Sequence, residues 1–65
     1  MNSQKMHAIQ LELPDHQAWA LAEFLKRVGY RDYRPLAVDD QEAYAMQEAG
    51  EKLRTALAEK GVAPR

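Results

Sequence analysis

One short alternating segment constrains the fold of this 65-residue chain more than any other feature. Between residues 5 and 13, Ile9, Leu11 and Leu13 alternate with Gln10 and Glu12. This two-residue period is typical of a strand that buries one face. A lone strand cannot satisfy its own backbone N–H and C=O groups, and the chain offers no second one. We therefore expect it to pair with the same strand of a second copy across a twofold axis.

Two amphipathic helices are predicted after the strand. Pro14 ends the strand and suits the first turn of a helix over residues 14–28. We expect Gly29 to end this helix with a positive φ, and Tyr30 to fold back on the apolar face. That face has helical spacing and consists of Ala18, Leu21, Ala22, Leu25 and Val28.

The second helix is predicted over residues 39–60. Asp39 and Glu42 have the spacing of a capping box, and Gly61 can close the other end. Gly50 lies within the apolar stripe, where it costs roughly 1 kcal/mol of helix stability. We expect close approach of another backbone to compensate for it.

These elements predict an α+β fold that is mostly helical, in the order β-α-α, with strand pairing between the subunits of a dimer. Residues 1–65 form a single domain. Its parts are a flexible start (1–4), the strand (5–13), a helix (14–28), an ordered connection (29–38), a helix (39–60) and a tail (61–65). The predicted dimer interface comprises Ile9, Leu11, Leu13, Gly50 and Leu53. In the connection, Leu36 and Val38 are expected to face inward.

The composition leaves association as the means of stabilising so small a domain. The absence of cysteine excludes disulfides and thiolate metal sites, and His7 and His16 lie far apart. We expect neither a metal nor a cofactor. Nine basic and ten acidic side chains leave no excess charge that would attract phosphate. A short polar start and the lack of a long apolar run predict a cytoplasmic protein that is not bound to a membrane.

Enzymatic activity is not expected. The sequence has no glycine-rich phosphate loop, nucleophile motif or catalytic pair at a recognisable spacing. A domain of this size also has little room for a pocket that excludes water.

A basic and aromatic stretch over residues 26–34, together with Trp19 on the flank of the first helix, is the candidate partner-binding surface. Four of the nine positive charges lie in this stretch. The alternative is structural: cations are favoured at a helix C-terminus, tyrosine rings pack on core edges, and tryptophan is mostly buried. The candidate residues are Trp19, Lys26, Arg27, Arg31, Tyr33 and Arg34.

The segment "IQLELPDHQAWALAEFLKRVG", residues 9–29, resembles the opening of ribbon-helix-helix proteins. The resemblance implies a dimer whose two-stranded ribbon enters the major groove of DNA, with Ala8, Gln10 and Glu12 facing the bases. The connection before the second helix is longer than in that family. The second helix also begins with carboxylates, which repel the phosphate that its N-terminus would otherwise attract.

The stretches "AWALAEFLKRVG", "AVDDQEAYAM" and "APR" resemble a group of short proteins encoded on bacterial prophages and other mobile elements. No activity is established for that group. The resemblance implies a role between element and host, including inhibition of a host complex. The sequence therefore predicts a small, non-enzymatic, dimeric protein-interaction module that acts on an unidentified host protein as an inhibitor or adaptor. The alternative is a ribbon-helix-helix-like transcriptional regulator.

Overall fold

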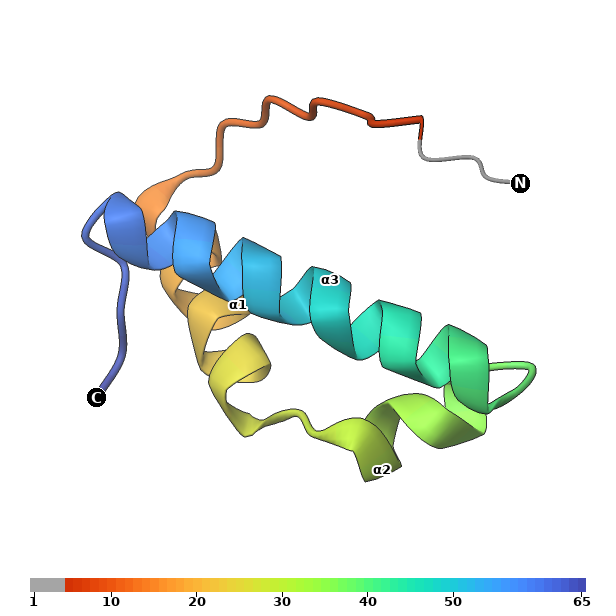
Figure 1. Ribbon diagram of the computed structural model, residues 1–65. Helices are drawn as coiled ribbons and strands as arrows, with labels where there is room; N and C mark the ends of the chain where they lie inside the picture. The colour runs from red at the N-terminus through yellow and green to blue at the C-terminus, as the bar shows by residue number, and fades with distance from the viewer. Residues whose placement is uncertain (1–4) are drawn as a thin grey trace.

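The computed structural model describes residues 5–65, which fold into three α-helices and one 3-10 turn (Figure 1). Helix α1 spans Asp15–Arg27, α2 spans Tyr30–Tyr33, the 3-10 turn η1 spans Arg34–Leu36, and α3 spans Asp40–Glu59. The bounds of the two long helices differ by one residue at each end from the predicted ranges. The flexible start expected for residues 1–4 lies outside the described residues.

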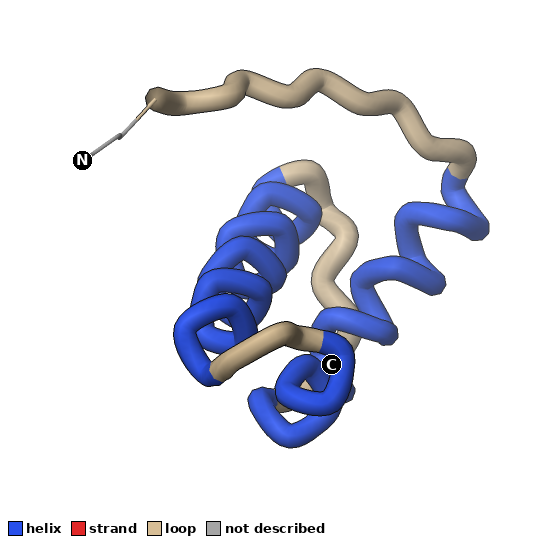
Figure 2. Tube along the Cα trace, turned by 90° about the vertical axis from the view of Figure 1, so that its right-hand side faces the viewer, coloured by secondary structure: helices blue, strands red, loops and turns tan. Residues whose placement is uncertain are grey.

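The predicted N-terminal strand is wrong. Residues 5–14 have neither helix nor strand geometry, and residues 9–13 pass the C-terminal half of α3 (Figures 1 and 2). An alternating segment becomes a strand only when a second strand accepts and donates its backbone hydrogen bonds. The rest of the described chain folds into helices and supplies none. Residues 5–65 are therefore helical rather than α+β, and the strand pairing between subunits is overturned with the strand.

Helix α1 ends differently from the prediction. The N–H of Val28 donates to the Phe24 carbonyl at 2.9 Å, and Val28 itself is extended. Gly29 has φ −132°, not a positive φ. Its N–H donates to Asp32 Oδ2 at 2.8 Å and so begins α2. Gly29 is thus the start of the next helix rather than a Schellman residue closing α1.

Both ends of α3 confirm the capping predictions. The N–H of Glu42 donates to Asp39 Oδ1 at 2.9 Å. The Glu42 carboxylate accepts in return from the N–H of Val38 at 2.8 Å, one residue earlier than in a standard capping box. At the other end Gly61 takes φ 88°, and the following N–H returns to the Leu57 carbonyl at 2.9 Å. These bonds satisfy backbone groups that a helix end otherwise leaves open.

The core between α1 and α3 is small. Among the described residues, only Ala22, Leu25 and Ala43 are buried. Two alanines let the helix axes approach closely, but they bury little apolar surface. The large apolar side chains that remain exposed are Met6, Ile9, Leu11, Trp19, Phe24, Leu36, Val38, Tyr44 and Leu53.

The connection between the long helices is regular structure, but it does not bury the residues expected to face inward. Leu36 is 78% exposed and Val38 is 83% exposed. Their alternate positions would share one side only in an extended chain. Here Arg34 has helical angles, φ −55° and ψ −45°, although proline follows it and disfavours them. The connection therefore coils through α2 and η1.

Gly50 is approached by a side chain rather than by another backbone. A Cβ built on Gly50 would collide with the Tyr33 hydroxyl and would lie 3.6 Å from Leu25 Cδ2. Tyr33 comes from α2, so this glycine lets the connection pack against the middle of α3. The position is filled from within the same chain.

The elements form a flattened body with extents of 36 × 27 × 16 Å. Helices α1 and α3 run in roughly opposite directions, and the start of α1 lies beside the end of α3 (Figure 1). Helix α2 and η1 pack under the first half of α3. No helix in residues 5–65 has the length and apolarity needed to cross a membrane.

Candidate functional site

A clamp centred on Asp40 fixes the connection to α3. The Tyr30 hydroxyl donates to Asp40 Oδ1 at 2.9 Å, and Arg34 Nε donates to the same oxygen at 2.6 Å. Arg34 Nη1 also donates to the Ala37 carbonyl at 3.3 Å. The Tyr30 ring packs against the Tyr44 ring, with centroids 4.7 Å apart and planes tilted by 34°. The connection is therefore held at both of its ends.

The clamp sets the protonation states of its own members. The hydrogen bond from Tyr30, and then the bond and charge of Arg34, hold the pKa of Asp40 below its usual range. Desolvation first, and then the hydrogen bond to Asp40, raise the pKa of Tyr30. At neutral pH the carboxylate is an acceptor and the phenol is a donor, as the geometry requires. These groups serve structure, and neither is poised to exchange a proton near neutral pH.

The candidate partner-binding residues from the sequence are divided between structural and exposed positions. Tyr33 packs against Gly50, and Arg34 belongs to the Asp40 clamp. Arg27 pairs with Glu23 at 3.0 Å along α1. Lys26 and Arg31 are exposed, and Trp19 is 38% exposed. The basic residues of the connection thus do not stand together as one outward platform.

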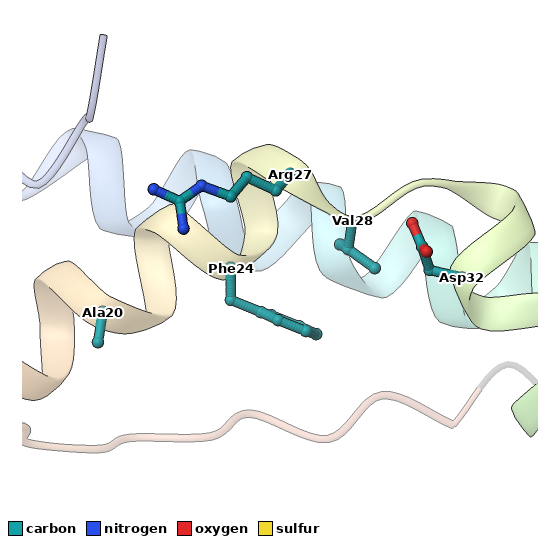
Figure 3. Close-up of a pocket in the computed structure, with 5 residues that line it drawn as sticks. All are labelled: Ala20, Phe24, Arg27, Val28 and Asp32. Atoms are coloured by element: carbon teal, nitrogen blue, oxygen red, sulfur yellow. The ribbon is translucent and has the colours of Figure 1, made fainter.

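A hollow lies beside Phe24 on the surface of α1 (Figure 3). It has a volume of about 350 Å³ and is open to solvent. Phe24 is 54% exposed, and its ring projects from the same side of α1 as Ala20. Val28 continues the apolar floor toward α2, while Arg27 and Asp32 supply opposite charges at the rim. We call these five residues the Phe24 hollow.

Sequence reasoning missed Phe24, although a signal was present. The predicted apolar face of the first helix left this aromatic residue on its flank. Five residues separate Trp19 from Phe24, which places them about 140° apart around the helix. One flank of α1 therefore carries Trp19 and the other carries Phe24. A large aromatic residue off the buried stripe of a helix is the pattern that could have found the hollow.

A second apolar surface lies where residues 9–13 pass α3. One hollow of about 300 Å³ is lined by Ile9, Gln10, Leu11, Leu13, Leu53, Ala56, Leu57 and Lys60. A neighbouring hollow of about 490 Å³ continues it to the start of α1 and to Val62. Four of the five predicted dimer-interface residues line this surface, whereas Gly50 is covered by Tyr33.

The residues proposed to read DNA do not form a ribbon. Ala8, Gln10 and Glu12 are exposed, but they belong to the unpaired segment. Gln10 also lines the hollow beside α3 together with Ile9, so the side chains of this segment do not divide into an inner and an outer row. The geometry on which base contacts depended is missing from residues 5–65.

The described residues contain no cluster of side chains that could bind a metal ion. No group of three or more His, Asp or Glu side chains in residues 5–65 could hold one metal ion. His7 and His16 are both exposed. The hollows beside Phe24 and α3 are lined mainly by carbon, which suits packing against another apolar surface.

These features define a small helical protein with a thin core and two apolar surface hollows. The chain matches DUF7706, a family of unknown function, over residues 1–65 and belongs to that family. No curated protein and no solved structure matches it. Family membership therefore adds no activity or ligand to what the geometry offers.

Proposed function

We propose that the protein is a small interaction module without enzymatic activity, and that it binds a second protein through the Phe24 hollow. The observation that carries this proposal is the exposed ring of Phe24 on helix α1, beside a hollow that is open to solvent. Aromatic anchors in such pockets supply most of the free energy of many protein interfaces.

The scaffold supports this role. Asp32 at the rim is fixed by the hydrogen bond from the Gly29 N–H, and Arg27 is held by Glu23. A surface that is ordered before binding loses less entropy on association. Opposite charges at the rim also favour one orientation of the partner over others. A segment with an apolar side chain between an acidic and a basic residue fits this arrangement.

The resemblance to short proteins of prophages and mobile elements points to the kind of partner. We infer that the second protein belongs to the host cell and that binding inhibits it or links it to another component. The same resemblance, with the charge balance of the chain, favours a cytoplasmic complex. This part of the proposal rests on the resemblance and not on the hollow itself.

Affinity purification with matched variants tests the proposal. The tagged full chain is expressed in its native host, and co-purified proteins are quantified by mass spectrometry. Phe24→Ser and Ala20→Arg should each reduce capture of the specific partner roughly tenfold or more. The first substitution removes the aromatic anchor, and the second fills the hollow beside it. The control Leu36→Ser removes an even more exposed apolar side chain, at 78% against 54% for Phe24, from the connection and should leave capture unchanged.

Each variant must keep the circular dichroism spectrum of the parent chain. If a folded Phe24→Ser protein captures the same partner in the same amount, the hollow is not its binding site. Equal losses in Phe24→Ser and Leu36→Ser would indicate nonspecific apolar capture and would also overturn the proposal.

A further inference from the structure

The second apolar surface carries an inference that goes beyond the proposed function. Met6, Ile9 and Leu11 project from residues 5–14 and are 82%, 84% and 68% exposed. Beside Ile9 and Leu11 lie Leu53, Ala56 and Leu57 of α3. We call these six residues the terminal face. It shares no residue with the Phe24 hollow, so the two surfaces can be occupied independently.

In a single copy, the apolar side chains of the terminal face are left exposed to water. Ile9 and Leu11 remain largely in water although a hollow of about 300 Å³ lies next to them, and Met6 is exposed on the same segment. The core elsewhere consists of two alanines and one leucine among the described residues. A chain of this size without disulfides normally gains the missing burial from a metal or from association. Within residues 5–65 no metal cluster is available.

We propose that the terminal face binds the terminal face of a second copy across a twofold axis. The face contains both the projecting side chains and the groove that could receive them, which is the self-complementarity that a twofold interface requires. Ile9 and Leu11 of each copy then enter the groove beside α3 of the other. The contact is made by side-chain packing and needs no strand pairing.

The available area fits a dimer of moderate affinity. Four large apolar side chains, namely Met6, Ile9, Leu11 and Leu53, offer on the order of 60–120 Å² each. Adding backbone and the smaller residues brings the total near the lower limit of about 600 Å² per copy for a specific interface. We therefore expect self-association in the micromolar range rather than a permanent dimer.

Sedimentation equilibrium of the full chain and two charge variants tests this interface. Ile9→Glu places a carboxylate in the terminal face, and Val38→Glu makes the same change at an equally exposed position on the connection. We expect the parent and Val38→Glu proteins to dimerise alike, and Ile9→Glu to self-associate at least tenfold more weakly. Both substitutions are at exposed sites, so helix content should be unchanged.

Cysteine crosslinking gives an independent geometric readout, because the chain contains no native cysteine. A mixture of Leu11→Cys and Leu53→Cys proteins should form a covalent heterodimer with a short bis-maleimide. A mixture of Leu11→Cys and Glu51→Cys should not, since Glu51 lies about 160° around α3 from Leu53, away from the terminal face.

Three results would overturn the inference. A monomeric parent protein at every concentration would show that the segment closes on its own α3 or awaits a different partner. Equal association of the Ile9→Glu and parent proteins would move the interface elsewhere. Crosslinking from position 51 as efficient as from position 53 would indicate nonspecific contact. Capture of the host partner by Ile9→Glu protein but not by Phe24→Ser protein would keep the two surfaces distinct.

Discussion

At the scale of single residues, Gly50 lowers the stability of α3 but makes room for the side chain of Tyr33. The sequence identified the cost, since glycine within a helix is unfavourable relative to alanine by roughly 1 kcal/mol. It could not identify the neighbour, because Tyr33 lies seventeen residues earlier, in a connection that coils through α2 and η1. The expectation of a close approach was useful, but the approaching group is a phenol ring.

A double-mutant cycle tests this contact. Gly50→Ala should lower the free energy of unfolding by about 1 kcal/mol, because the new methyl group displaces the Tyr33 hydroxyl. In the Tyr33→Phe background the next ring atom is at an ordinary contact distance of 3.5 Å. There the same change should stabilise the protein by up to about 1 kcal/mol through helix propensity. Urea denaturation measures both values, and an equal effect in the two backgrounds would exclude the contact.

At the scale of elements, the sequence predicted correctly those helix ends that depend only on residues close to them in the chain. The start of α3 needs only Asp39 and Glu42, and its end needs only Gly61, so short-range spacing was sufficient. The end of α1 was predicted wrongly because a glycine after a helix suits two outcomes: a positive φ, or the extended start of another turn. The carboxylate of Asp32 selects the second outcome. The helical path of the connection, with Leu36 and Val38 outward, followed from this choice.

The two glycines should therefore respond differently to alanine. Gly61→Ala forces a side chain into φ 88° and should cost about 1 kcal/mol of unfolding free energy. Gly29→Ala keeps an ordinary extended φ, and its new methyl group would meet nothing closer than Asp32 Oδ2 at 4.0 Å. It should cost no more than a few tenths of a kcal/mol. Thermal denaturation distinguishes them, and a larger loss at Gly29 would contradict the assigned helix ends.

The Asp40 clamp makes the fold sensitive to acid. Folding lowers the pKa of Asp40, so the ionised carboxylate stabilises the folded state. This contribution is complete above the pKa of Asp40 in the unfolded chain, about 3.9. It is lost as the pH falls through the lower pKa of the folded state. Asp40→Asn should reduce stability at neutral pH and flatten the decline below about pH 5. Tyr30→Phe, which removes the first donor, should show part of the same change. Parallel pH profiles for Asp40→Asn and the parent chain would count against the clamp.

At the scale of the whole molecule, the sequence shows which residues are apolar, but it does not show where they gather on the surface. Alternation in residues 8–13 was a real pattern, but a strand depends on a partner that no residue of the described chain provides. The length and the absence of cysteine predicted association, and this stays a prediction. The positions of the hollows could not be predicted from the sequence, because they depend on how α1, α3 and the N-terminal segment lie in space.

We propose that two separate surfaces of residues 5–65, the Phe24 hollow and the terminal face, carry the function. Site-specific photocrosslinking in the native host tests it in one measurement, with a photoreactive amino acid placed in turn at Phe24, Leu11 and Glu51. We expect a product with a second protein from position 24, a homodimer from position 11, and neither from position 51. The same products from all three positions, or none from positions 24 and 11, would contradict the account.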